Sequence, residues 1–370
     1  MSEPSLFHTG HFRFNAKDYR RAITFARVKG KSLRHIKADC TEPRYGLVQC
    51  KSLAVYKFLA NLLNSGNHRL LTLKLTNLKW LRESTVHPRS DVIKLLATLL
   101  EHQQQLRVVD LSNARLRVKQ GRLILKALSK HCSETVHTLN IDALISFKVP
   151  QDPQDGRYFA RFISAMCSFR NLSDLRLPLG YLQDNVLQSL AAAAKNSLEF
   201  LTIRCHYKPR AVSRINPSAW LTLTSACPNL KVRFSLRPKE DSYFDLVPCN
   251  LLIPAIPLDT FNWTCGSLIS LDNLQQCFEH LAHNFQNTLR HISLKAGVRL
   301  DAERIRDLME SIHECSQLET LSIRLKCDLS GDDEFYKTAI QDAVDEHRMT
   351  CAVKFNGHDV GSLNDMSFME

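Results

Sequence analysis

The residues best suited to metal chemistry in this sequence lie in QQCFEHLAHNF, where Cys277, His280 and His283 follow one another at intervals of three. Thiolate and imidazole are ligands that zinc prefers. An i, i+3, i+6 spacing drifts around a helix, so it brings two ligands together more readily than three. His8 and His11 form a second pair near the start of the chain, where no flanking element fixes them. Ordinary buried and solvated roles explain both groups, and we predict no metal site.

Motifs for catalysis or cofactor binding are missing from the sequence. None of GxGxxG, GxxxxGK[ST], GxSxG or HExxH occurs, and the 12 cysteines include no CxxC pair. A reactive site needs a nucleophile with a base, paired carboxylates or a phosphate loop at a defined spacing. We therefore predict a protein that is not an enzyme, with no catalytic residue and no cofactor.

The composition is that of a globular protein with a strong internal gradient of charge. The 370 residues are 44% hydrophobic and 23% charged, with a formal net charge of +12. Residues 1–130 carry 25 basic and 8 acidic side chains, whereas residues 241–370 carry 10 and 21. No apolar run approaches the roughly 18 residues that span a bilayer, and the start lacks the apolar core of a secretory signal. We expect a cytoplasmic or nuclear protein with no membrane partner.

A phrase of the form LxxLxL recurs along the whole chain. Its clear copies are SLRHIKA, RLLTLKL, QLRVVDL, TVHTLNI, NLSDLRL, SLEFLTI, TLRHISL and QLETLSI, and two weaker copies are LKVRFSL at 230–236 and IPAIPL at 253–258. The first anchors run from Leu33 to Leu318 with a mean spacing of about 32 residues, longer than in regular leucine-rich repeats. Each phrase predicts a short strand whose leucines point inward, and stacked repeats bury a continuous core.

Between the phrases the apolar period changes from 2 toward 3.6, as helices require. The segments with this pattern are 51–64, 91–101, 119–130, 157–166, 184–196, 217–226, 272–284, 301–315 and 334–346. The sequence thus predicts an α/β leucine-rich repeat solenoid, or horseshoe, with a parallel concave sheet and convex helices. We assign residues 1–15 to an N-terminal segment, 16–355 to an array of about ten irregular repeats, and 356–370 to a flexible tail.

In such an array the side chains between the buried ones point to the concave face of the sheet. This places six cations there as an intermittent basic column: Lys37, Lys74, Arg176, Arg204, Lys295 and Arg324. The column predicts either a surface for a protein partner or simple solubility. The charged segment 206–216, with Lys208, Arg210, Arg214 and Tyr207, is a further candidate for contact with phosphate or an acidic peptide.

Cysteines mark the point where a helix ends and the next strand begins. Cys227 and Cys315 precede their anchor by three residues, Cys132 by four and Cys167 by five. A tight corner suits a small apolar side chain, so we predict buried thiols at these positions.

The helix, cysteine, PNL and strand pattern resembles the cysteine-containing leucine-rich repeats of F-box proteins. The phrases KSLRHIKADC, NHRLLTLKL, VHTLNID, FRNLSDLRL, LEFLTIRCH and PNLKVRFSLR follow one another in the order of such a repeat region. The resemblance implies the substrate-binding part of a Skp1–cullin–F-box (SCF) ubiquitin ligase receptor. An F-box itself is not evident in the chain, so docking to the Skp1 adaptor is doubtful.

Two functions remain open at this point. One is a noncatalytic recognition subunit of a ubiquitin ligase, which binds a protein substrate on the concave face. The other is an independent leucine-rich repeat scaffold for an acidic protein or for nucleic acid, which the basic front half favours. Because no aromatic residues interleave with the basic ones as a base-stacking surface needs, we consider nucleic acid the poorer candidate.

Overall fold

The computed structural model of the chain describes residues 8–14, 18–41, 48–78, 89–145, 153–205, 215–237, 251–264, 271–296, 302–325, 338, 341–342, 352–355 and 358–361. The chain divides into two compact units. The first comprises Met1–Pro178, Gln183–Glu199 and Ser225–Asn229, and the second comprises Leu179–Leu182, Phe200–Thr224 and Leu230–Glu370.

The first unit alternates strands with helices, and each strand pairs in parallel with the next one along the chain. Its strands are β1 (Thr9–Arg13), β2 (His35–Asp39), β3 (Thr72–Thr76), β4 (Val108–Asp110), β5 (Thr138–Asn140) and β6 (Asp174–Pro178). Its helices are α1 (Tyr19–Lys29), α2 (Val48–Asn64), α3 (Arg89–Glu101), α4 (Val118–His131), α5 (Pro153–Met166) and α6 (Asp184–Ala193), with the 3-10 helix η2 (Gly30–Ser32) before β2.

The second unit continues the same pattern with longer strands. Its strands are β7 (Phe200–Cys205), β8 (Lys231–Leu236), β9 (Leu258–Thr264), β10 (His291–Ala296), β11 (Thr320–Leu325), β12 (Ala352–Phe355) and β13 (His358–Gly361). The pairs from β7 to β12 are parallel, and β13 returns antiparallel to β12. The unit also contains the 3-10 helix η4 (Leu179–Tyr181), most of α7 (Pro217–Ala226), α8 (Leu271–Phe285) and α9 (Ala302–His313).

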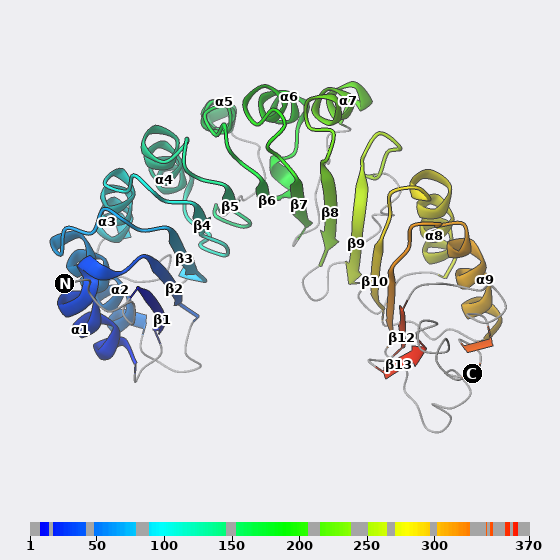
Figure 1. The fold of residues 1–370 in the computed structure, drawn as a ribbon, viewed down its shortest axis with the longest axis horizontal. Coiled ribbons are helices and arrows are strands. Elements are labelled where there is room, and N and C mark those ends of the chain that lie inside the picture. Colours follow the sequence, from blue (N-terminus) through cyan, green and yellow to red (C-terminus); the bar gives the residue numbers. More distant parts are fainter. Residues whose placement is uncertain are drawn as a thin grey trace, which may run out of the picture. The chain divides into compact units, whose positions relative to one another are not determined.

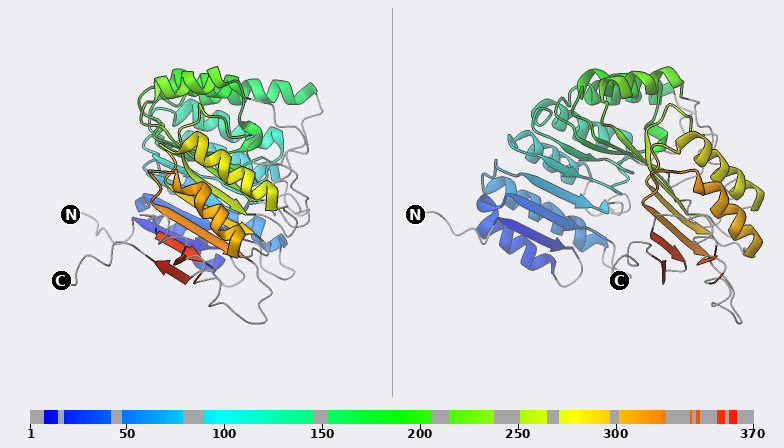
Figure 2. Two further views of the ribbon diagram at one scale, coloured as in Figure 1. Left: turned by 90° about the vertical axis from the view of Figure 1, so that its right-hand side faces the viewer. Right: turned by 45° about the vertical axis from the view of Figure 1, so that its right-hand side comes forward.

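In both units the helices cover one face of the strands (Figures 1 and 2). The anchor leucines and the apolar stripes of the helices fill the space between the two layers. Leu73 and Leu75 of β3 are fully buried, as are Leu99 and Leu100 of α3. A strand whose alternate residues face a helix layer has this period-2 burial. The α/β leucine-rich repeat solenoid expected from the LxxLxL phrases is therefore the fold of the chain.

Three parts of the structure differ from the sequence expectation. The strand β1 and the helix α1 were not anticipated. The strand predicted from the weak copy IPAIPL at 253–258 is wrong, because the strand β9 lies at Leu258–Thr264. Pro254 and Pro257 explain the shift, since proline has no N–H to give to the ladder. The strands β1 and β13 also lie outside 16–355, while the division of the chain into an array and two terminal segments stays a prediction. The helix expected at 334–346 falls largely outside the described residues.

The corners between helix and strand carry a ladder of hydrogen bonds from each repeat to the preceding one. The buried amide of Asn67 donates to the carbonyl oxygens of Gly30 and Leu33, at 2.6 and 2.8 Å. In the next repeat, buried Gln103 donates to the carbonyl oxygen of Asn67 at 2.8 Å. The thiol of Cys132 then contacts the carbonyl oxygen of Gln103 at 3.6 Å. These side chains satisfy backbone groups that a buried corner would otherwise leave unpaired.

The cysteine positions expected at these corners are confirmed for Cys132, Cys227 and Cys315, which are buried. The expectation is wrong for Cys167, which is exposed. Cys167 lies just past the end of α5, five residues before its anchor, and Phe169 fills that corner with a fully buried ring. The buried corner position is therefore the one that lies three or four residues before the anchor, whichever residue occupies it.

Burial also sets the reactivity of these thiols, because the thiolate is the nucleophile. Burial raises the pKa of Cys132 to about 12. Burial likewise raises the pKa of Cys227, although the backbone N–H groups of Leu198 and Asn196 oppose it in part. We expect iodoacetamide at pH 8 to label Cys167 well before Cys132 or Cys227 in the native protein. Peptide mass spectrometry checks the order, and rapid labelling of Cys227 would contradict its burial.

Candidate functional site

The candidate site is the face of the strands that points away from the helices, here called the sheet face. Its side chains come from the residues between the buried anchors. In the first unit the register sets His11, Lys37 and Lys74 side by side on β1, β2 and β3. Lys37 is exposed and Lys74 is half-buried, and within the described part of the chain neither forms an ion pair.

Two lysines at opposed positions of neighbouring strands repel each other. Adjacent strands lie about 4.8 Å apart, and like charges in directly opposite positions are destabilising. The next residue in the row is Asp110 on β4, opposite Lys74. This carboxylate is engaged by its own turn, because its Oδ1 accepts a hydrogen bond from the backbone N–H of Ser112 at 3.0 Å. A hydrogen bond from a neutral N–H does not cancel the charge of a carboxylate, so Asp110 offsets one of the two lysines and this part of the row keeps a net positive charge.

Asp39, at the end of β2, is also tied to the local structure. Its Oδ1 accepts hydrogen bonds from the Thr41 backbone N–H at 2.9 Å, the Thr41 hydroxyl at 2.5 Å and the Asn77 amide at 3.0 Å. Burial raises the pKa of Asp39, but these hydrogen bonds and the charge of Arg13 outweigh it and lower the pKa overall. Asp39 is therefore an ionised hydrogen-bond acceptor at the end of its strand. Its carboxylate is used to hold the turn that follows β2.

Arg176, the third cation expected in the first unit, lies in the same row but is neutralised. Its guanidinium contacts the carboxylate of Asp174 two residues earlier on β6, with the η2 nitrogen 2.8 Å from Oδ2 and Nε 3.3 Å from Oδ1. The hydrogen bonds that Arg176 donates to Asp174 raise the pKa of Arg176, burial lowers it, and the charges of Asp174 and Asp110 raise it further. A bidentate ion pair of this kind leaves little net charge. Arg176 therefore interrupts the basic column that the sequence predicted.

The second unit separates its three expected cations into two rows. Lys295 and Arg324 lie opposite each other on β10 and β11, both exposed, and no ion pair joins them to another described residue. Arg204 pairs in register with Ser235. From Ser235 the row of paired residues continues to Asn262 on β9 and Ser293 on β10. On β10, Ser293 lies two residues before Lys295. The structure therefore joins Lys295 with Arg324 and leaves Arg204 in a different row.

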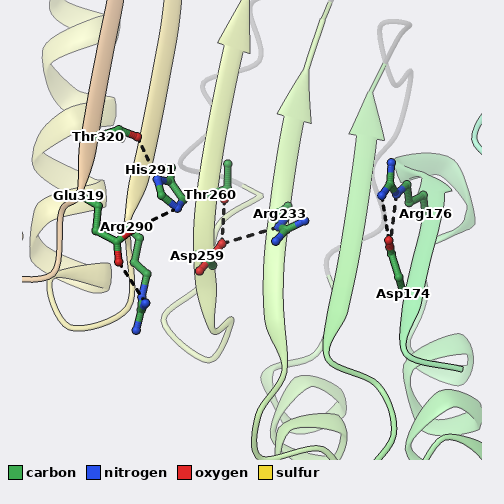
Figure 3. A network of polar contacts seen from close by, with 9 residues as sticks. All are labelled: Asp174, Arg176, Arg233, Asp259, Thr260, Arg290, His291, Glu319 and Thr320. Atoms are coloured by element: carbon green, nitrogen blue, oxygen red, sulfur yellow. Dashed lines mark hydrogen bonds and ion pairs between the residues drawn. The ribbon is translucent and has the colours of Figure 1, made fainter. Parts of the chain in front are cut away.

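A polar cluster around Arg233 was not anticipated from the sequence. The register of β8 and β9 shifts between Val232 and Arg233, so that Asp259 is an extra residue in β9. A bulge of this kind redirects a side chain. The nearly buried Asp259 carboxylate lies 3.7 Å from Nε of Arg233 and accepts a hydrogen bond from the Thr260 hydroxyl at 2.8 Å (Figure 3). The Arg233 guanidinium also lies 4.0 Å from the centre of the Phe200 ring.

Next to the starts of β10 and β11, Glu319 contacts the side chains of Arg290 and His291. It accepts a hydrogen bond from Arg290 at 3.1 Å, and its second oxygen lies 3.7 Å from Nε2 of His291 (Figure 3). The other ring nitrogen of His291 lies 2.9 Å from the Thr320 hydroxyl. All four residues are at least partly exposed, so these contacts order the strand ends more than they stabilise the fold.

The metal candidates from the sequence do not converge. Cys277 is fully buried in α8, and His283 is exposed. His280 Nε2 donates to the carbonyl oxygen of Leu252 at 2.6 Å, and Asn284 donates to its Nδ1 at 3.2 Å. Both ring nitrogens are thus occupied. No three His, Cys, Asp or Glu residues in the described ranges lie close enough to hold a metal ion.

Two further sequence observations have limited structural counterparts. Residues 206–214, with Lys208, Arg210, Arg214 and Tyr207, lie outside the described residues. Among the residues that the structure does describe, no helix is both long and apolar enough to cross a membrane.

Comparison with known proteins adds no family assignment, since no family model matches the chain. Among solved structures, the leucine-rich repeat protein LegL7 from Legionella pneumophila aligns over 95% of this chain and 92% of its own, with 12% identity and a TM-score of 0.41. A structure described as a TLR13–ssRNA13 complex aligns over 80% of this chain and 36% of its own, with 13% identity and a TM-score of 0.33.

Proposed function

We propose that this chain is a noncatalytic recognition module that binds a partner protein through its sheet face. The observation that carries the proposal is the opposed pair Lys37 and Lys74, whose neighbouring carboxylates Asp39 and Asp110 are held by local turns. A pair of like charges in opposed positions costs free energy in the isolated protein. An anionic partner turns this cost into binding energy and speeds association.

The resemblance to F-box proteins, and to the F-box only protein 39 group in particular, gives the module a specific role. The partner is then a substrate of an SCF ubiquitin ligase, and the repeats select it while other subunits perform the chemistry. An independent scaffold for an acidic protein is the second candidate, favoured by the same unbalanced lysines. The two candidates share the binding surface and differ in the fate of the bound protein.

The fate of the bound protein separates these candidates. The wild-type chain and a variant with Lys37 and Lys74 both changed to glutamate are used to capture proteins from cells. Proteins that bind the wild-type chain but not the variant are the partners of the sheet face. Their half-lives are then compared by pulse-chase in cells with the chain alone and in cells with the chain fused behind an F-box. The ligase role predicts shorter half-lives with the fusion. Unchanged half-lives of the same proteins would leave only the scaffold.

A further inference from the structure

Three residues on the sheet face of the second unit lie on one diagonal line across the strands. Arg233 of β8 pairs with Thr260 of β9, and Asn262 lies two residues beyond Thr260. Asn262 in turn pairs with Ser293 of β10, and Lys295 lies two residues beyond Ser293. Each step therefore crosses one strand and advances two residues, which places Asn262 midway between Arg233 and Lys295.

The length of this diagonal follows from the spacing of a sheet. With strands about 4.8 Å apart and about 3.3 Å per residue along a strand, Arg233 and Lys295 lie roughly 16 Å apart at the backbone. An extended peptide advances about 3.3 Å per residue as well, so the same length corresponds to about five residues of a bound segment.

Arg233 is oriented as a binding group should be. The ring of Phe200 supports the flat face of its guanidinium at 4.0 Å, and Asp259 lies 3.7 Å from Nε. Within the described part of the chain, Asp259 is the one carboxylate that forms an ion pair with Arg233, and it does so through Nε. The two terminal nitrogens therefore remain for a ligand, on a side chain that is 37% exposed. A guanidinium fixed in this way loses little entropy when it pairs with a carboxylate.

The other positions on the diagonal complement Arg233. Lys295 is exposed and lies opposite Arg324, so this end carries two positive charges. Asn262 between the two ends has a side-chain amide that both donates and accepts hydrogen bonds. Its neighbours in the row are Ser235 and Ser293, small side chains that leave room above the sheet. An amide over small neighbours suits the backbone of an extended chain.

The charge of the surrounding sequence makes these cations conspicuous. Residues 241–370 contain 21 acidic and 10 basic residues. Of the described acidic residues, Asp272 and Glu279 lie on α8 and Asp307 and Glu310 lie on α9, while Asp259 and Glu319 lie at or next to the starts of strands. On β10 and β11 the sheet face presents Lys295 and Arg324, two cations within a negative segment. Such a surface complements an anionic partner.

We propose that this diagonal binds an extended acidic segment of the partner protein, with one carboxylate at Arg233 and a second, five positions away, at Lys295 and Arg324. The inference rests on the proposed function, because it names the kind of partner that the sheet face recognises. Asn262 fixes the backbone of the segment between the two charges. Recognition thus depends on the spacing of the acidic residues and not only on their number.

The test uses the full chain and two fluorescein-labelled peptides of 12 residues with the same composition. One carries two glutamates five positions apart, and the other carries them two positions apart. In fluorescence anisotropy titrations at about 0.15 M salt, we expect the first peptide to bind roughly tenfold more tightly than the second. Arg233→Ala and Lys295→Ala should each weaken it by roughly tenfold. Phe200→Leu should weaken it less, because the charge remains while its support is lost.

Arg306→Ala is the matched control, since it removes an exposed cation from the helix α9 and should leave peptide affinity unchanged. Circular dichroism melting checks that every variant folds. Equal affinity for the two peptides, an equal loss with Arg306→Ala, or tighter binding of a 12-nucleotide single-stranded DNA would overturn the inference. If neither peptide binds while capture through Lys37 and Lys74 persists, the inference fails and the proposed function stands.

Discussion

Leu175→Ala is expected to lower the free energy of unfolding by about 2–5 kcal/mol, the usual cost of truncating a fully buried leucine. Leu175 has no exposed surface and is the inward anchor of β6, where the side chain meets the helix layer. Alanine removes its apolar contacts and leaves a cavity that flanking repeats fill only in part. In a solenoid this loss weakens both the repeat itself and its contacts with its neighbours.

The matched control is Leu221→Ala on α7, the same chemical change at a side chain that is 55% exposed. Guanidinium denaturation followed by circular dichroism measures both variants. We expect the midpoint to fall clearly for Leu175→Ala and to shift by less than the equivalent of about 0.5 kcal/mol for Leu221→Ala. Equal midpoints for the two variants would contradict the assignment of Leu175 to the core.

Charge reversal on the sheet face should abolish partner binding while the fold survives. The variant carries glutamate at Lys37, Lys74, Lys295 and Arg324, four cations of the sheet face for which no ion pair with another described residue is found. We expect the affinity for a partner captured by the wild-type chain to fall at least about 100-fold, since attraction becomes repulsion at each site. The wild-type affinity should weaken with added salt, and the residual binding of the variant should lack this dependence.

A second variant with the same change in net charge controls for non-specific electrostatics. It carries glutamate at Lys57, Lys126, Lys130 and Arg306, all exposed on helices. Surface plasmon resonance at two salt concentrations compares the two variants. If the helix variant loses as much affinity as the sheet variant, the partner responds to total charge, and the sheet face has no special role.

The fold was largely predictable because its dominant signal is local. The LxxLxL phrases alternate buried and open positions, and the helices between them have wide apolar stripes. The helix α1 escaped prediction because its buried side chains are small, with Ala22 and Ala26 in the core. The strand β1 lacks the leucine phrase, since its inward positions are Gly10 and Phe12. Both elements are defined by packing against β2 and α2, which no local pattern reveals.

The candidate site was predictable only in outline. The sequence identifies which residues point to the sheet face, but not which of them are already neutralised. Arg176 lies two residues from Asp174, and only the side-chain conformations show that these two groups pair. Arg233 was missed because the buried Val232 and Phe234 follow Leu230 by two and four residues, whereas the LxxLxL spacing assigns position 233 to the core. The corner residues Asn67 and Gln103 carry a usable signal, since each precedes its anchor by three residues, as Cys227 does.

The most direct test of the account is lysine footprinting of the chain in complex with a captured partner. Brief acetylation followed by peptide mass spectrometry reports the accessibility of each lysine, with and without the partner. We predict that Lys37, Lys74 and Lys295 on the sheet face become protected, while Lys57 and Lys126 on the helices stay equally reactive. Protection of the helix lysines with unchanged labelling at Lys37, Lys74 and Lys295 would contradict recognition by the sheet face.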